Sequence, residues 1–231
     1  MINIVSAAHS SVGKKIVTGL TGLALILFIL VHLAGNLTLY FGASAFNGYA
    51  AFLEEIGHHM LLPVAEVCLA AVFLFHIVAG VSVALRRREA RTVPYYKAAD
   101  AAHTSTKTSS SLTMIWTGSG LFVFLILHIL QFRIANVMTP PAQRNLYNLV
   151  VNVFHQPLYV GIYTLVMLGL GLHLRHGFWS AFQSLGLNNK RILPFLYGFA
   201  VLFAVVIALG FLAIPIYMYT AGVATLPVGG H

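Results

Sequence analysis

Five long apolar stretches constrain this chain more than any other feature of its sequence. Each approaches or exceeds the roughly 20 residues that an α-helix needs to cross the hydrocarbon core of a bilayer. They cover residues 16–40, 61–85, 112–132, 157–178 and 192–219. Inside lipid every backbone polar group must be paired within the protein, and the alternation typical of a membrane β-barrel is missing. We therefore predict an all-α integral membrane bundle of five transmembrane helices.

The composition agrees with a lipid environment and excludes an ordinary soluble domain. Hydrophobic residues make up 59% of the chain and charged residues 8%, against about 45–50% and about 25% in soluble domains. We expect a single membrane domain over residues 1–231, without a tandem repeat. The first apolar run follows Lys14 and Lys15 without a cleavage-like segment, so we expect it to remain in the protein. The single cysteine, Cys68, excludes an internal disulfide.

The distribution of charge predicts the orientation in the membrane. Thirteen Lys and Arg against five acidic residues give a net charge of +8, which in a soluble protein would suggest nucleic-acid binding. Here most cations lie in the connections on one side of the predicted bundle. They are Lys14, Lys15, Arg86, Arg87, Arg88, Arg91, Lys97, Lys107, Arg175, Lys190 and Arg191. The other side holds only Arg133 and Arg144. The positive-inside rule then places the amino terminus in the cytoplasm and the carboxyl terminus outside, and we expect no nucleic-acid partner.

Four histidines are the main candidate functional residues. His32, His76, His128 and His173 lie one in each of the first four apolar runs, whereas the fifth run has none. An ionisable side chain inside a membrane span is costly and is therefore a candidate for function. One such histidine could equally serve as a hydrogen-bonding group between helices. Four of them, one in each helix, favour a shared chemical role.

Helix geometry groups these histidines into two layers. At about 1.5 Å per residue, His32 and His128 each lie sixteen residues into an outward-running helix, roughly 24 Å from the cytoplasmic edge. His76 and His173 lie on inward-running helices, about 14 Å and roughly 9 Å from the same edge. We therefore predict that His76 pairs with His173 in an inner layer, and that His32 pairs with His128 in an outer layer.

Two facing histidines at each of two depths are what bis-imidazole ligation of two haems requires. One ring nitrogen binds the iron from each side, and the porphyrin fits between helices. Four helices would then enclose two stacked haems b, held non-covalently because the chain has no CxxCH motif. Glycines near the histidines would let a macrocycle approach the backbone, although close helix packing explains them equally well. They are Gly19, Gly22, Gly35, Gly80, Gly118, Gly120, Gly169 and Gly171.

Three stretches of the chain resemble a known family. The sequence SSVGKKIVTGLTGLALILFILVHLAGNL, at 10–37, resembles the first helix of the cytochrome b subunits of succinate dehydrogenase and fumarate reductase. VAEVCLAAVFLFHIVAGVSVALRRR, at 64–88, is similar to their second helix, and GLGLHLRHGFWSAFQSLGL, at 169–187, to their fourth. The resemblance implies the single-chain, five-helix form with two haems b, in the bacterial cytoplasmic membrane.

The resemblance also implies a function, ligands and partners. The family's four haem ligands fall on His32, His76, His128 and His173, in the same two pairs. The chain would anchor a succinate:quinone oxidoreductase in the lipid and carry electrons between its iron-sulfur subunit and a membrane quinone, menaquinone or another. A flavoprotein with FAD and an iron-sulfur protein would be separate chains on the cytoplasmic side. This chain has neither a GxGxxG motif nor a cysteine cluster, so alone it would lack the dicarboxylate site.

The candidate residue for quinone chemistry is Glu66. It is the only carboxylate well inside a predicted span, and it lies ten residues, roughly 15 Å, outward of His76. A structural acid bound to a neighbouring helix or to a haem propionate explains it equally well. An inner quinone site near His176 and Trp179 is the alternative. Some fumarate reductases of the family have a glutamate before the fourth-helix histidine, where this chain has 169–172 as GLGL, which leans toward succinate oxidation.

Three other interpretations of the histidines remain open. The chain could be the cytochrome b anchor of another membrane oxidoreductase, such as a hydrogenase or a formate dehydrogenase. It could instead be a transporter without haem, in which intramembrane histidines relay protons. Zinc is a weaker alternative, because no Cys, Asp or Glu accompanies both predicted pairs to complete four-coordinate sites.

Overall fold

A computed structural model describes residues 10–89, 109–187, 189 and 191–225, and these residues form helices and no strand. Five helical segments are long and apolar enough to cross a membrane. They are Val12–Phe41, Leu61–Leu85, Thr113–Met138, Pro157–Ser184 and Leu193–Ala221. The prediction of an all-α protein with five membrane-spanning helices is confirmed, and it indicates a multi-pass membrane protein.

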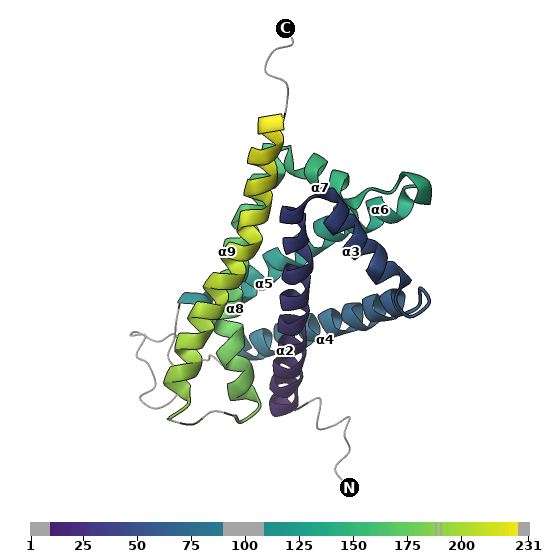
Figure 1. Cartoon of the computed structure of the whole chain (residues 1–231). Helices are drawn as coiled ribbons and strands as arrows, with labels where there is room; N and C mark the ends of the chain where they lie inside the picture. The colour runs from purple at the N-terminus through teal and green to yellow at the C-terminus, as the bar shows by residue number, and fades with distance from the viewer. Residues whose placement is uncertain (1–9, 90–108, 188, 190, 226–231) are drawn as a thin grey trace. The chain divides into compact units, whose positions relative to one another are not determined.

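Five long helices supply these segments (Figure 1). They are α2 (Ser11–Leu37), α4 (Leu61–Glu89), α5 (Ser109–His128), α8 (Pro157–Ser184) and α9 (Leu193–Thr225). The first continues as the short 3-10 helix η1 (Thr38–Phe41). The third continues through a π-helix, η2 (Ile129–Ile134), and then α6 (Ala135–Met138), so it ends beyond the predicted residue 132. Arg133 and Asn136 interrupt the apolar pattern there without interrupting the helix.

Three further helices lie in connections for which we predicted no secondary-structure element. They are α3 (Ala43–Glu55), η3 (Pro141–Gln143) and α7 (Leu146–Phe154). Gly42, at a φ of 88°, makes the turn between η1 and α3. Asn47 of α3 donates to Asn145 and accepts from the backbone of Tyr147, and Asn145 also caps the start of α7. One amide side chain therefore ties α3 to α7.

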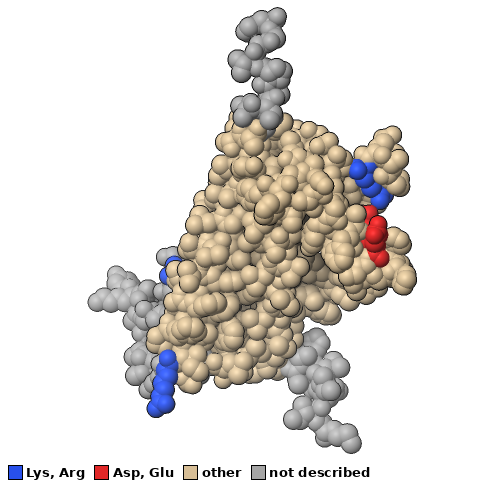
Figure 2. Space-filling view, in the orientation of Figure 1, with Lys and Arg blue, Asp and Glu red and all other residues tan. Residues whose placement is uncertain are grey.

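The long helices expose apolar side chains in the way expected of helices in lipid. Leu27, Val67, Trp116 and Leu165 are each more than 60% exposed. In water such exposure would be unfavourable, whereas lipid chains solvate these groups. Charged side chains form only a few small groups on the face drawn in Figure 2.

The chain divides into two compact units whose boundaries fall inside the long helices. Unit one comprises Met1–Phe28, Val67–Gly118 and Leu172–Ala204. Unit two comprises Ile29–Glu66, Ser119–Gly171 and Val205–His231. All five long helices contribute residues to both units. Each unit is described by itself below.

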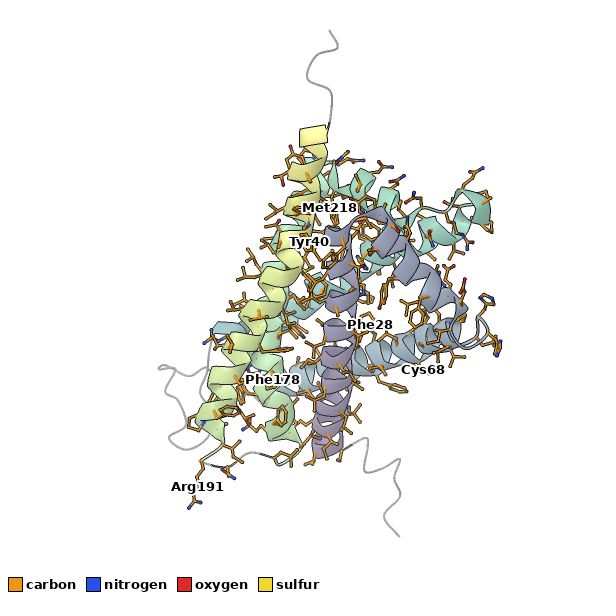
Figure 3. All side chains as sticks on the ribbon, viewed as in Figure 1. Phe28, Tyr40, Cys68, Phe178, Arg191 and Met218 are labelled. Carbon is orange, nitrogen blue, oxygen red and sulfur yellow. The ribbon has the colours of Figure 1, made fainter. Side chains whose placement is uncertain are left out.

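Unit one is packed by aromatic side chains and by close helix contacts. Phe28 of α2, labelled in Figure 3, meets Phe73 of α4 edge to face, with ring centres 6.3 Å apart. Trp179 of α8 is buried with Leu196 and Ala200 of α9. These contacts join α2 to α4 and α8 to α9.

Unit two uses the same kinds of contact. Leu33 of α2 packs against Gly210 of α9, where a Cβ atom would lie 2.8 Å from the leucine. Tyr40 lies beside Tyr217 with ring centres 4.7 Å apart. Leu39 is almost completely buried. The small residue at 210 therefore lets α2 and α9 approach each other closely within this unit.

Candidate functional site

The structure brings His76 of α4 and His173 of α8 together in unit one. Their ring centres are 6.3 Å apart, and the ring planes are inclined at 68°. We call these two residues the unit-one pair. They are the two histidines that we predicted for the inner layer.

His32 of α2 and His128 of α5 meet in unit two. Their ring centres are 5.7 Å apart, and the planes are nearly perpendicular at 86°. Phe211 and Phe124 lie beside these rings, with centres 5.9 Å from His32 and 5.6 Å from His128 respectively. We call the two histidines the unit-two pair. Each of the four helices α2, α4, α5 and α8 thus supplies one histidine, and each predicted pair meets.

The spacing of the rings can be compared with what a shared metal ion needs. A metal–imidazole bond is about 2.0–2.1 Å long, so two imidazoles on opposite sides of one ion have ring centres more than about 4 Å apart. The ring centres are farther apart than this in both pairs, at 6.3 Å in unit one and 5.7 Å in unit two. Neither spacing is too short for an ion held by both rings.

Threonine hydroxyls bind both histidines of the unit-one pair. Thr21 Oγ1 of α2 lies 3.2 Å from Nδ1 of His76, and Thr117 Oγ1 of α5 lies 3.2 Å from Nδ1 of His173. A ring nitrogen that is hydrogen-bonded in this way fixes the orientation of the imidazole and leaves Nε2 to face another group. Such second partners are typical of metal-binding histidines.

Glycines let these imidazoles lie close to the neighbouring helix. A Cβ atom at Gly22 would lie 3.3 Å from Cε1 of His76, and one at Gly118 would lie 3.4 Å from Cε1 of His173. We had expected these glycines to admit a macrocycle or to pack helices, and here they adjoin the rings themselves. Gly35 instead accommodates Tyr49.

Tyr163 of α8 is the polar partner of the unit-two pair. Its hydroxyl lies 3.2 Å from Nδ1 of His128 and donates to Oε1 of Gln131 at 2.8 Å. Tyr163 is only 5% exposed, so this hydrogen bond lies within the protein. Gln131 belongs to the π-helix that follows His128, and its buried Nε2 has no hydrogen-bond partner among the described residues. π-Helical turns are frequent at functional sites.

Sequence reasoning missed Thr21 and Thr117, although a signal was present. Each is followed by glycine, and each precedes a predicted ligand by eleven residues, His32 in one case and His128 in the other. The stretches TGLALILFILVH, at 21–32, and TGSGLFVFLILH, at 117–128, share five of twelve residues. We expected no tandem repeat, yet the contacts show that the two stretches play the same part on α2 and α5.

Glu66 forms an ion pair that sequence reasoning did not foresee. Arg133 Nε lies 2.7 Å from Oε1 of Glu66, and Arg133 Nη2 lies 3.0 Å from Oε2. The two-pronged contact ties α4 to η2 within unit two. Both side chains are a little over one-third exposed. This is a bond to a neighbouring helix, one of the two roles that we had considered for Glu66.

Other polar residues of the described chain lie in different surroundings. Glu54 lines a small cavity of about 120 Å³ together with Arg144. His58 and His59 are exposed and adopt left-handed backbone conformations, and the ring of His59 bonds the carbonyl of Glu54. The alternative inner quinone site was predicted near His176 and Trp179, whose ring centres are 5.0 Å apart. Trp179 is 4% exposed and belongs to the packed core.

Metal-binding clusters of the zinc type are not seen in the described part of the chain. No group of three or more His, Cys, Asp or Glu side chains there is arranged to hold a metal ion. A haem iron needs only two protein ligands because the porphyrin supplies the other four, so two histidine pairs suit haem better than zinc.

No protein-family model, curated protein or solved structure matches this chain.

Proposed function

We propose that the chain is the di-haem cytochrome b subunit that anchors a succinate:quinone oxidoreductase in the membrane. It would carry electrons between the iron-sulfur subunit and a membrane quinone, menaquinone or another. The observation that supports this most strongly is the meeting of four membrane histidines in two separate pairs. Each pair draws its members from two different helices and lies in its own unit.

The residues fit two non-covalent haems b, with His76 and His173 holding one and His32 and His128 the other. Hydroxyl groups of Thr21, Thr117 and Tyr163 orient three of the four rings. When bound, such a haem would supply one-electron transfer.

Glu66 and Arg133 are the candidates for contact with quinone in unit two. A quinone takes up protons as well as electrons, so its site requires a group that exchanges protons. Glu66 offers a carboxylate, and it is partly exposed beside a guanidinium. We keep the catalytic assignment on Glu66, with Arg133 as its charge partner.

The choice of succinate oxidoreductase over other membrane enzymes rests on sequence resemblance. The resembling stretches at 10–37, 64–88 and 169–187 include three of the four histidines and the Arg86–Arg88 cluster. In the proposed assembly a flavoprotein with FAD and an iron-sulfur protein bind on the cytoplasmic side. The amino terminus then lies in the cytoplasm of a bacterium and the carboxyl terminus outside.

Purification in a mild detergent tests the proposal. We expect the isolated complex to contain two low-spin haems b, to be reduced by succinate, and to include a flavoprotein and an iron-sulfur chain. A haem-containing complex that is reduced by hydrogen or formate and not by succinate would assign the chain to another oxidoreductase. A preparation without a dithionite-reduced haem spectrum would favour the histidine-containing transporter.

A further inference from the structure

The contacts of Thr21 with His76 and of Thr117 with His173 repeat one arrangement on two pairs of helices. In both, a threonine hydroxyl lies 3.2 Å from the Nδ1 atom of a histidine on another helix. In both, the glycine that follows the threonine lets the ring lie against the helix. The repetition indicates that each threonine hydroxyl is placed to form a hydrogen bond with Nδ1 of its histidine.

The direction of these hydrogen bonds follows from the other contacts of each hydroxyl. Thr21 Oγ1 lies 2.7 Å from the carbonyl oxygen of Val17, nearer than the 3.2 Å to His76. Thr117 Oγ1 lies 3.0 Å from the carbonyl oxygen of Thr113. A carbonyl can only accept, and a hydroxyl has one hydrogen, so this hydrogen goes to the backbone. Each hydroxyl therefore accepts from the imidazole, whose Nδ1 carries the proton and whose Nε2 keeps its lone pair.

We propose that Thr21 and Thr117 are positioning residues that fix the tautomer of the unit-one pair and lower the reduction potential of the iron it holds. This inference rests on the proposed haem function. An acceptor on Nδ1–H makes the ligating nitrogen more basic. A more basic axial ligand favours oxidised iron, so the potential falls. Because Tyr163 takes the corresponding place in unit two, the threonines affect one of the two centres.

The two threonines act on the two imidazoles of one pair. Thr21 contacts Nδ1 of His76, and Thr117 contacts Nδ1 of His173. Replacement of either threonine should therefore raise the potential of the same iron.

Redox titration of the purified, haem-containing complex tests the inference. Valine keeps the shape of threonine without the hydroxyl, and serine keeps the hydroxyl. We expect Thr117→Val to retain two low-spin haems and to shift the midpoint potential of one upward, and Thr21→Val to shift the potential of the same haem in the same direction. Thr117→Ser should return the potential toward that of the wild type. Thr220→Val is the matched control, because this hydroxyl bonds the carbonyls of its own helix, and both potentials should stay unchanged.

Each outcome of the titration decides between the two proposals. Unchanged potentials in Thr117→Val, while the wild type binds two haems, would overturn the positioning role and leave the haem function standing. A shift in Thr117→Ser as large as in Thr117→Val would overturn it too, because shape and not the hydroxyl would then be responsible. If the Thr117→Val variant does not assemble, Thr117→Ala replaces it in the test. Alanine lacks the hydroxyl and is not β-branched, and the potential of the same haem must again shift upward. A wild-type complex without haem would contradict the proposed function itself.

Discussion

At the residue scale, a membrane interior leaves a histidine few ways to satisfy its ring nitrogens. A buried N–H without an acceptor costs roughly 1–3 kcal/mol, and lipid supplies no acceptor. His76, His128 and His173 each have an oxygen 3.2 Å from Nδ1. The protein therefore provides one polar contact for each of these rings and directs the second nitrogen elsewhere.

The sequence predicted which histidines meet, but not what binds them. The rise of a helix converts residue number into depth, which was enough to pair His76 with His173 and His32 with His128. The partners depend on the rotation of each helix about its axis. Thr117 was not predicted because a threonine in a helix usually bonds only its own backbone, and nothing local shows that its hydroxyl also faces a histidine.

The ion pair between Glu66 and Arg133 adds a structural role to the residue that we propose for the quinone site. An acid and a base inside membrane spans usually occur as a pair, because either charge alone is costly in lipid. The estimated depth of Glu66 in the membrane made it a candidate. Arg133 was assigned to the outer connection, because the third helix was predicted to end at residue 132. The carboxylate that we propose as the proton-exchanging group is thus also half of a salt bridge.

We predict that Glu66→Gln lowers quinone turnover by about 10²- to 10⁴-fold, the usual contribution of a general acid or base. Glutamine keeps the shape of glutamate and one acceptor but has no titratable proton. Both haems should be retained and should still be reduced by succinate. Steady-state quinone reduction and a reduced spectrum of the same preparation measure the two quantities.

A double variant separates this catalytic role from a structural one. Glu66→Gln leaves the Arg133 charge without its carboxylate, and that alone could impair the protein. Glu66→Gln combined with Arg133→Gln removes both charges. Turnover should stay low in the double variant, and its recovery would show that Glu66 serves only as the charge partner of Arg133.

At the scale of the secondary-structure elements, the long helices were predicted well and the short ones were not. A run of 20 or more apolar residues has no other stable form in lipid, so all five spans appeared near their predicted positions. α3 and α7 lie in connections, and α7 is only nine residues long. Helices this short are marginal alone, so their formation depends on contacts such as Asn47 with Asn145, which local sequence does not specify.

Two glycine substitutions test the packing of α2 against α3 in unit two. An alanine Cβ at Gly35 would lie 2.5 Å from the Tyr49 ring, so Gly35→Ala should destabilise the protein by about 1–3 kcal/mol despite better helix propensity. At Gly48 no atom lies within 4 Å of the Cβ position, so Gly48→Ala should stabilise by roughly 0.5–1 kcal/mol. Thermal unfolding in detergent should shift in opposite directions for the two variants, and shifts of the same sign would contradict the packing.

At the scale of the whole molecule, one histidine pair lies in each compact unit, and the same long helices run through both units. The first four of these helices each contribute one histidine to a pair, and α8 carries His176 as well. Two sites are therefore held by a single set of helices, and no separate domain is needed for either. The predicted single domain over residues 1–231 remains compatible with this division, since every boundary falls inside a continuous helix.

The predicted orientation can be tested by labelling cysteines in intact cells. Several of the cations that set it, Arg91, Lys97, Lys107 and Lys190, lie outside the described residues, as does Ser105. In a Cys68→Ser background, Ser105→Cys should react with a membrane-impermeant maleimide only after the membrane is permeabilised. Ala142→Cys, in the exposed connection at η3, should react in intact cells. Labelling of Ser105→Cys in intact cells would contradict the predicted orientation.

The pairing of the histidines as haem ligands is the central claim, and the four single His→Ala variants test it most directly. Reduced-minus-oxidised spectra and redox titrations should be recorded for each. We predict that His76→Ala and His173→Ala lose one and the same haem or convert it to high spin, and that His32→Ala and His128→Ala do so for the other. Loss of the same haem in His32→Ala and His76→Ala would contradict the pairing. Retention of both low-spin haems in all four variants would contradict the ligand assignment altogether.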